Sequence, residues 1–286
     1  MESDLSEAVA AATLYVVSTP IGNMGDFSFR AVEVLKSVKV VLAEDTRHTR
    51  HLLGRYEITT SLASYHEHNE AKMTPALVER LRGGESMALV SDAGTPLLSD
   101  PGSRLVKAAA EAGVAVVPVP GASALLAALV ASALDLDRFT FFGFLTRSGA
   151  DRRRELDEIT DLRHTVVLYE SPNRLAATLG ELEQRGNGPR TAVVAREMTK
   201  QFEEVRRGTV SELRAYYEER QPRGEIVLMI GAAAQVIVGD AEVRERVLAL
   251  RASGVSARDA AATVAEELGV SKKLAYRFAM ESGGEN

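Results

Sequence analysis

The 286-residue sequence contains no cysteine, and this absence removes several kinds of chemistry at once. Disulfide bonds, thiolate metal sites and cysteine nucleophiles are all excluded. The five histidines do not restore a metal site, because their spacing is not typical of a ligand set: His48 and His51 lie three residues apart, and His66 and His68 flank Glu67. We therefore expect no structural metal.

The sequence also lacks an excess of positive charge. Its formal net charge is −6 at pH 7, which argues against general affinity for nucleic acids, DNA included. A nucleic-acid substrate would have to be met by a local basic patch.

Signals for export or membrane insertion are absent as well. The first ten residues have no basic start typical of a signal peptide. One apolar segment, Val114–Leu134, is interrupted by Pro118, Pro120 and Gly121. A strand, a turn and a buried helix explain this segment better than a membrane span. We expect a cytoplasmic protein with no membrane partner.

Short β-branched runs alternate with helical periodicity from Thr13 onward. The pattern predicts strands near 13–18, 38–43, 87–91 and 114–119, with helices near 28–36, 46–55, 69–82, 102–112 and 122–133. Such alternation indicates a mostly parallel sheet with helices on both faces. After a linker at 134–138, the pattern predicts strands at 139–144, 165–170, 191–197, 203–208 and 225–231. Helices are expected at 150–163, 172–185 and 209–219, and the close runs at 191–197 and 203–208 favour a hairpin in a mixed sheet.

The last part of the chain has a different, all-helical pattern. Residues 241–252, 256–268 and 271–281 predict three short helices, with Ser256 and Ser271 as N-caps and Gly254 and Gly269 as breaks. The pattern is typical either of a helix-turn-helix or of a compact helical appendage that packs on the body or on a partner. The expected organisation is a flexible N-terminus (1–12), two α/β domains (13–134 and 139–234) and a small helical unit (240–286).

Three strands of the first domain end in glycine- or proline-containing loops. The loops are Thr19–Asn23, Ser91–Pro96 and Pro120–Ser123, and each lies where open α/β sheets bind ligands. None carries the Lys-Ser/Thr of a P-loop or the GxGxxG of a dinucleotide fold. Loops of this kind suit a small ligand with little negative charge that backbone groups contact. S-adenosylmethionine is such a ligand, so the loops indicate a methyltransferase.

Two basic clusters offer local patches for RNA phosphates. The segment Glu44–Arg50 ends a predicted strand and begins a helix, and Asp45 can cap that helix. A second cluster follows the strand at 139–144, where three consecutive arginines oppose the helix dipole. Both clusters are also compatible with solvated helix ends. As RNA contacts we predict Arg47, His48, Arg50, Arg147, Arg152, Arg153 and Arg154.

Methylation of an alcohol oxygen needs an aligned nucleophile and an acceptor for the hydroxyl proton. Asp45 lies at one strand end of the first domain, and Glu170 lies at one of the second. Glu170, Glu197 and Lys200 would line a cleft if they face the loops of the first domain. We therefore predict Asp45 or Glu170 as the base and Lys200 as electrostatic support, without ranking them.

These motifs resemble a known family. The segments VVSTPIGNMGD, VVLAEDTRHTRHLL, ALVSDAGTPLLSDPG, VVPVPGASALLAAL, VLYESPNRL, VAREMTKQFEE and GEIVLMI occur in the order found in the bacterial 16S rRNA (cytidine-2′-O)-methyltransferases. These enzymes are a branch of the tetrapyrrole methylase fold family. The resemblance covers roughly residues 13–231. EDTRHT and SDAGTP are specific to the rRNA branch, whereas the tetrapyrrole branch would show GxGPGD-like and GDP-like loops.

The resemblance implies two α/β domains of the tetrapyrrole methylase type, S-adenosyl-L-methionine in the cleft between them, and a homodimer. The implied substrate is the ribose 2′-hydroxyl of a cytidine in the decoding centre of 16S rRNA, within the 30S subunit. A 2′-hydroxyl also distinguishes RNA from DNA. The cofactor would contact Pro20, Ile21, Gly22, Asp92, Ala93, Gly94, Thr95, Gly121, Ala122, Ser123, Tyr169, Met198, Gly224 and Glu225, with Glu170 beside them.

Two alternatives stay open at this point. On the same fold, the chain could methylate a small tetrapyrrole or a protein side chain, and a bound porphyrinoid would favour that function. It could also be a non-catalytic ribosome assembly factor. The intact loops argue against an assembly factor, because a protein that only binds has no need of a cofactor cleft.

Overall fold

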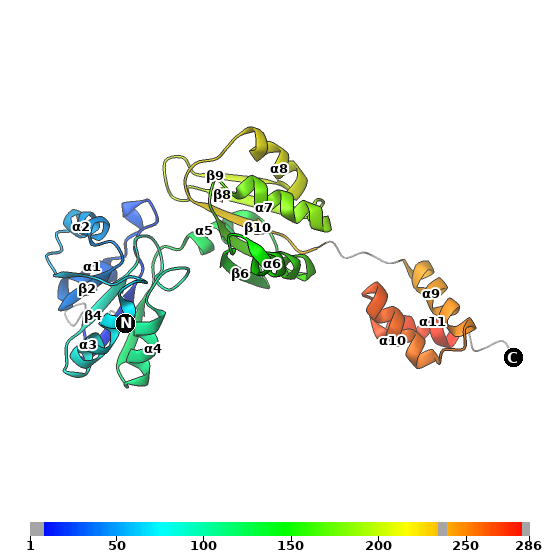
Figure 1. The fold of residues 1–286 in the computed structure, drawn as a ribbon, viewed down its shortest axis with the longest axis horizontal. Coiled ribbons are helices and arrows are strands. Elements are labelled where there is room, and N and C mark those ends of the chain that lie inside the picture. The colour runs from blue at the N-terminus through cyan, green and yellow to red at the C-terminus, as the bar shows by residue number, and fades with distance from the viewer. Residues whose placement is uncertain (1–8, 234–238, 282–286) are drawn as a thin grey trace. The chain divides into compact units, whose positions relative to one another are not determined.

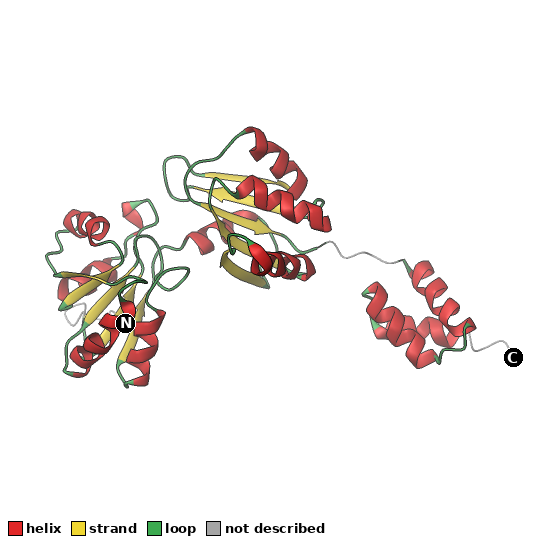
Figure 2. Cartoon of the chain, in the orientation of Figure 1, coloured by secondary structure: helices red, strands yellow, loops and turns green. Residues whose placement is uncertain are grey.

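The computed structural model describes residues 9–233 and 239–281. The chain divides into two compact units, residues 1–233 and residues 234–286. The first unit contains two β-sheets surrounded by helices, and the second is helical (Figures 1 and 2).

The first sheet has five strands in the order β3-β2-β4-β1-β5, and every pairing between them is parallel. Its three central strands are buried along their whole length, as expected for a parallel sheet covered on both faces. The strands are β1 (Thr13–Val17), β2 (Val40–Ala43), β3 (Leu62–Ser64), β4 (Met87–Val90) and β5 (Ala115–Val119).

Two helices cover each face of this sheet. Helices α1 (Phe29–Ser37) and α2 (Thr46–Arg55) contribute to one apolar core, in which Val34 and Leu53 pack near the strand residue Val41. Helices α3 (Glu70–Arg82) and α4 (Ser103–Glu111) contribute Leu77 and Leu105 to a second core on the opposite face. A short 3₁₀ helix, Met24–Asp26, follows β1.

The second sheet is mixed, with strand order β6-β7-β10-β8-β9. The β6–β7 pair is parallel and the other pairs are antiparallel, so the predicted 191–197/203–208 hairpin is confirmed. The strands are β6 (Phe139–Phe144), β7 (Thr165–Glu170), β8 (Thr191–Arg196), β9 (Glu204–Thr209) and β10 (Ile226–Ile230). One face carries α6 (Gly149–Asp161), α7 (Leu175–Leu182) and α8 (Val210–Glu219), which share one large apolar core with the strands.

Helix α5 (Ala124–Ser132) covers the other face of the second sheet, although it directly follows the first sheet in sequence (Figure 1). Leu125 and Leu129 pack with Val167 and Met229 in one apolar cluster. The Arg207 side chain of β9 donates hydrogen bonds to carbonyl groups at the C-terminal end of α5. The predicted linker at 134–138 therefore follows a helix that already packs on the second sheet.

The predicted strands and helices are confirmed to within a few residues at most ends. Strand β3 was missed, because three residues with partly exposed side chains give almost no periodic signal. The helix expected at 172–185 begins at Leu175 and ends in a π-type turn, Glu183–Asn187. Ser171 and Arg174 form a turn before it, in which the Ser171 carbonyl accepts from two backbone N–H groups.

The apolar segment Val114–Leu134 forms β5 and α5, joined at the Pro120–Ser123 loop. Among the described residues, no helix is long and apolar enough to cross a membrane.

The second unit consists of three helices around a small core, as predicted. They are α9 (Asp240–Ala252), α10 (Ala257–Leu268) and α11 (Lys272–Glu281), and Val247, Val264 and Phe278 meet in their core. Ser256 caps α10, and Gly269 ends it in the left-handed conformation. The basic residues Lys272 and Lys273 are exposed.

Candidate active site

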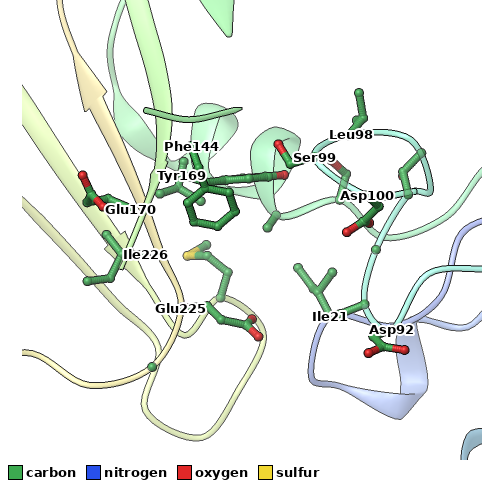
Figure 3. Close-up of a pocket in the computed structure, with 18 of the residues that line it drawn as sticks. Ile21, Asp92, Leu98, Ser99, Asp100, Phe144, Tyr169, Glu170, Glu225 and Ile226 are labelled. Atoms are coloured by element: carbon green, nitrogen blue, oxygen red, sulfur yellow. The ribbon is translucent and has the colours of Figure 1, made fainter. Parts of the chain in front are cut away.

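A cavity of about 460 Å³ lies in the first unit, between the loops at the carboxyl edge of the first sheet and one end of the second sheet. Figure 3 shows Ile21, Asp92 and Asp100 on one side and Tyr169 and Glu225 on the other. Its volume is within the range typical of small-molecule sites. The lining residues are Ile21, Glu44, Asp92–Thr95, Leu98–Asp100, Ser123, Ala124, Phe144, Tyr169–Pro172, Met198 and Gly224–Val227.

The three glycine-containing loops are joined to one another at the cavity wall. Thr19 and Gly94 form an isolated β-bridge, with N···O distances of 2.9 and 3.1 Å. Ser18 Oγ lies 3.0 Å from Thr95 Oγ1, which also donates to the carbonyl of Ala122 at 3.2 Å. This arrangement fixes the wall in place before any ligand binds.

The opposite wall is aromatic and apolar. The Tyr169 ring lies 4.9 Å from that of Phe141 and 5.5 Å from that of Phe144. Met198 is buried in the apolar cluster that also contains Ile21. Aromatic faces and a polarizable thioether together suit a flat heterocycle.

The polar groups of the cavity are predominantly acidic. Among the described residues, no Arg, Lys or His lines it, whereas five carboxylates do. Burial and the neighbouring Asp92 raise the pKa of Glu44. The lining carboxylates are Glu44, Asp92, Asp100, Glu170 and Glu225.

Asp100 is the lining carboxylate whose pKa differs most from its ordinary value. Burial raises the pKa of Asp100 to about 6, and the nearby Glu44 and Asp92 carboxylates add to the rise against a hydrogen bond from Ser91. In Figure 3 its carboxylate points toward the cavity. A carboxyl group that titrates close to neutral pH can both accept and return a proton.

The loop that carries Asp100 has an unusual backbone. Leu97 and Ser99 have φ values of 77° and 69°, which side-chain-bearing residues rarely adopt. Gly143 of β6 lets this loop approach, because a Cβ at that position would collide with Ser99 Oγ. Strained backbone of this kind is concentrated at functional sites.

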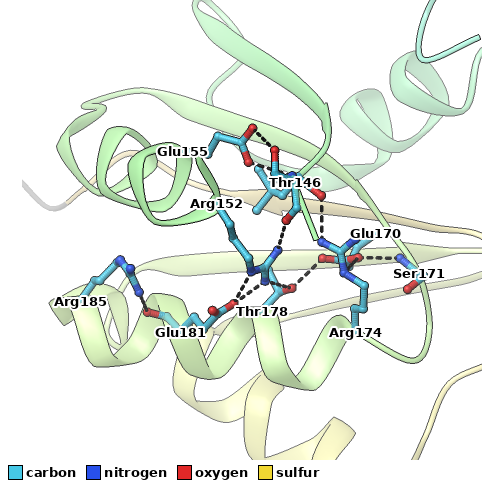
Figure 4. Close-up of polar contacts among 10 residues, drawn as sticks. Thr146, Arg152, Glu155, Glu170, Ser171, Arg174, Thr178, Glu181 and Arg185 are labelled. Carbon is cyan, nitrogen blue, oxygen red and sulfur yellow. Dashed lines mark hydrogen bonds and ion pairs between the residues drawn. The ribbon is translucent and has the colours of Figure 1, made fainter. Parts of the chain in front are cut away.

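Glu170 is held in a buried polar network beneath the cavity (Figure 4). Its carboxylate accepts from the Ser171 backbone N–H at 2.8 Å and from Thr178 Oγ1 at 2.6 Å, and it pairs with Arg174 at 3.2 Å. Thr178 also accepts from Arg152, which pairs with Glu181. Figure 3 shows the Glu170 carboxylate directed away from the cavity.

The family profile of tetrapyrrole (corrin/porphyrin) methylases matches residues 13–214. The chain belongs to this family. A second profile, the RsmI C-terminal HTH domain, matches residues 238–283. The chain is 44% identical to ribosomal RNA small subunit methyltransferase I of Pseudomonas aeruginosa over 97% of this chain and 100% of that protein. The protein of the same name from Synechocystis is 43% identical over 94% of this chain and 97% of its own length.

Solved structures share the fold of this family member at low identity. The methyltransferase CobJ superposes with a TM-score of 0.58 at 18% identity, covering 79% of this chain and 96% of its own. Uroporphyrin-III C-methyl transferase from Thermus thermophilus, in complex with S-adenosylhomocysteine, superposes with a TM-score of 0.55 at 19% identity, covering 77% and 96%. These likenesses support the fold of this methylase.

Most of the predicted cofactor contacts line the cavity. The exceptions are Pro20, Gly22, Gly121 and Ala122, which are absent from its lining. Gly22 lies under the Lys200 side chain, and Gly121 lies against Ser18. These two glycines allow close approach behind the wall.

Several lining residues escaped prediction. Leu98, Ser99 and Asp100 belong to the predicted β4 loop motif, but the motif gave no sign that its second half turns back into the cavity. Phe144 was seen only as the last residue of an apolar strand. Glu44 stood beside Asp45 in the same motif, and the structure puts Glu44 in the lining.

Asp45 occupies a different position from the one expected of a base. Its carboxylate caps α2 by accepting from the Arg47 backbone N–H at 2.8 Å and pairs with the Arg47 guanidinium at 2.9 Å. Hydrogen bonds from Arg47 hold the pKa of Asp45 well below its usual range. Asp45 is absent from the cavity lining, so its role as proton acceptor stays a prediction without geometric support.

Lys200 lies behind the cavity, where its ammonium group pairs with Glu197 at 2.9 Å and with Glu225 at 3.1 Å. Glu225 lines the cavity, so Lys200 offsets part of the negative charge of the lining through its ion pair with that carboxylate.

The predicted RNA contacts are all exposed except one. Arg47, His48, Arg50, Arg147, Arg153 and Arg154 have exposed side chains. Including Arg152 was wrong: it is only 6% exposed, and its guanidinium donates to Glu181, Thr178 and the Thr146 carbonyl. No group of three or more His, Asp or Glu that could hold a metal occurs in the described part of the chain.

Proposed function

We propose that this chain transfers a methyl group from S-adenosyl-L-methionine to the ribose 2′-hydroxyl of a cytidine in the decoding centre of 16S rRNA, with the 30S subunit as substrate. The observation that carries the proposal is the acidic, aromatic-walled cavity in a chain that shares full-length similarity with ribosomal RNA methyltransferases.

The residues present fit this cofactor. S-adenosylmethionine carries a sulfonium and an ammonium group against one carboxylate, so carboxylates in the lining complement its net positive charge. The aromatic wall at Tyr169 and the Met198 side chain suit the adenine ring. Backbone groups of the Ala93–Thr95 loop and the Ser123 loop would contact its polar parts.

The same charge pattern disfavours a tetrapyrrole substrate. Tetrapyrrole intermediates carry several peripheral carboxylates, and burying these beside Glu44, Asp92 and Asp100 would be opposed by like charge. A ribose is neutral, and its phosphates can stay outside the cavity. There the exposed basic residues at Arg47–Arg50 and at Arg147, Arg153 and Arg154 can contact them.

We assign the proton-accepting role to Asp100. The cofactor supplies a methyl group activated by its positively charged sulfur. The Asp100 carboxylate takes the proton of the attacking 2′-hydroxyl, so the oxygen gains the methyl group without building up positive charge. Glu170 and Lys200, proposed from the sequence for this chemistry, fit better as groups that position the Ser171 backbone and the Glu225 carboxylate.

We also propose a homodimer located in the cytoplasm. Phe29 and Val130 are 89% and 77% exposed, and a partner subunit would remove such side chains from water.

The test is methyl transfer from tritiated S-adenosylmethionine to 30S subunits that lack the modification, followed by nuclease mapping. Label on one cytidine ribose in the decoding region is the expected result. Absence of label despite cofactor binding would overturn the proposed RNA substrate, and tetrapyrroles and protein side chains would then be tested as substrates. Absence of cofactor binding at micromolar concentration would favour an assembly factor.

The net charge of −6 adds a second expectation. Naked 16S rRNA should be a poorer substrate than the folded subunit, because an acidic protein needs more than phosphate attraction to bind. Equal turnover on both substrates would contradict this expectation.

A further inference from the structure

A second cavity, of about 390 Å³, lies in the first unit on the β8–β9 side of the second sheet. It has a composition opposite to that of the acidic cavity. Its lining includes Arg196, Phe202, Tyr216, Tyr217, Arg220 and Arg223. We name it the arginine–aromatic cavity.

Two carboxylates, Glu197 and Glu204, also line this cavity, and both are already paired. Glu197 pairs with Lys200 at 2.9 Å, and Glu204 pairs with Arg196 at 3.1 Å and with Arg206 at 2.8 Å. The Arg223 guanidinium has no ion-pair partner among the described residues. The cavity therefore keeps a surplus of positive charge for an anion.

Flat surfaces for a base are also present. Phe202 is 65% exposed, which is costly for a phenyl ring without a partner. The Tyr216 ring is packed by two guanidinium groups, with Arg206 at 3.8 Å and Arg220 at 4.8 Å from its centroid. Stacked arginine and aromatic planes are the surfaces on which unpaired RNA bases rest.

The two cavities meet at one residue. Gly224 lines both of them, and it has a φ of 86°. A Cβ at this position would collide with the Glu197 carboxylate, which accepts from the Glu225 backbone N–H at 3.1 Å. A single glycine backbone therefore separates a site that fits a nucleoside cofactor from one that fits a nucleotide.

We propose that the arginine–aromatic cavity binds one unpaired nucleotide of the RNA substrate that neighbours the nucleotide being methylated. Its base stacks on Phe202, and its phosphate is held by Arg223, whereas Arg220 pairs with Glu219 at 2.8 Å. The proposal rests on the proposed rRNA substrate. It adds how the enzyme keeps a neighbouring nucleotide unpaired beside the one that is methylated.

The test compares two variants, Phe202→Ala and Arg223→Ala, with two matched controls. Phe139→Ala and Arg163→Ala remove an exposed phenyl ring and an exposed guanidinium at the N-terminal ends of the parallel strands β6 and β7. KM and kcat are measured on 30S subunits, and cofactor affinity is measured by equilibrium dialysis.

Phe202→Ala should raise KM for 30S subunits roughly tenfold, with kcat and cofactor affinity unchanged, because stacking contributes binding of that order. Arg223→Ala should lower the slope of log KM against log salt by about 1, since one phosphate contact is lost. The two controls should leave all three quantities unchanged.

Ultraviolet cross-linking of the wild-type chain to 30S subunits should join the Phe202 peptide to 16S rRNA next to the methylated cytidine. Wild-type KM in both variants would overturn the proposal, as would a cross-link to a ribosomal protein, which would assign the cavity to a peptide. A wild-type chain that never methylates 30S subunits would instead overturn the proposed function.

Discussion

The two cavities of the first unit differ in charge, and the difference separates two binding tasks. The acidic cavity presents carboxylates and no basic side chain among the described residues, whereas the arginine–aromatic cavity has its carboxylates paired and an arginine to spare. A cationic cofactor and a polyanionic substrate need opposite fields. The cofactor and the RNA must both bind next to one reacting oxygen, so the regions of negative and positive potential have to be separate. The loop at Gly224, which lines both cavities, provides that separation.

Removal of the proposed proton acceptor from the acidic cavity should have the largest effect on activity. Asp100→Asn should lower kcat on 30S subunits by about 10²–10⁴, a much larger effect than the several-fold loss of cofactor affinity expected when one lining charge is removed. In the wild type, kcat/KM should rise with pH through about 6, since Asp100 must be ionised to act. Stopped assays from pH 5 to 8 measure both. The matching variant Asp45→Asn should keep the pH profile, and loss of that profile in Asp45→Asn alone would return the role to Asp45.

Two neighbouring arginines test where the basic surface begins. Arg152→Ala removes a buried guanidinium and its hydrogen bonds to Thr178 and the Thr146 carbonyl, and should reduce the free energy of unfolding by about 1–3 kcal/mol. Arg153→Ala, on the exposed side of the same helix, should change stability by less than about 0.5 kcal/mol and raise KM for 30S subunits. Urea titrations and steady-state assays separate the two effects. Equal stability of both variants would contradict the buried network.

The acidic cavity should distinguish the charged cofactor from its neutral product. Glu44→Gln should weaken binding of S-adenosylmethionine several-fold, because one nearby negative charge is removed. Binding of S-adenosylhomocysteine, whose sulfur is uncharged, should change less. Calorimetric titration with each ligand gives the ratio of affinities, and an equal loss for both would show that the sulfonium charge is not sensed.

The stability of the fold should depend on pH through the same carboxylate, although the effect is smaller. The folded pKa of Asp100, about 6, lies above its ordinary value near 3.8, so the folded state binds this proton more tightly than the unfolded state. Its contribution is therefore present at low pH and is lost as pH rises through about 6. After allowance for solvent screening of a half-buried group, the loss is about 1 kcal/mol. Asp100→Asn should unfold at a higher temperature than the wild type at pH 8 and at an equal one at pH 4.

The sequence predicted every strand except β3, most helices and much of the lining of the acidic cavity, because those features follow from local apolar periodicity and from loops at strand ends. Asp100 could not be chosen in advance, since its place depends on a strained turn at Leu97 and Ser99 and on Gly143 from a distant strand. The arginine–aromatic cavity was also invisible, because Phe202 and Arg223 meet only through the antiparallel packing of the second sheet.

Arg152 shows why a charge run cannot be interpreted from sequence alone. Three consecutive arginines occupy three directions around a helix, and one of those directions meets Thr178 and Glu181 of α7. Periodicity indicates that one of the three faces inward. The partner that makes burial tolerable lies nearly thirty residues away and gives no local signal.

The packing of α5 has a consequence for dividing the chain. Cleavage at the linker after Leu134 would leave Leu125 and Leu129 on a fragment that has no surface to cover them, and would uncover the face of the second sheet at Val167 and Met229. A fragment ending at residue 134 should therefore aggregate, whereas one ending at residue 121 should stay monodisperse in size-exclusion chromatography. The place where the chain can be cut is set by what its helices cover, and it lies in the Pro120–Ser123 loop, ahead of α5.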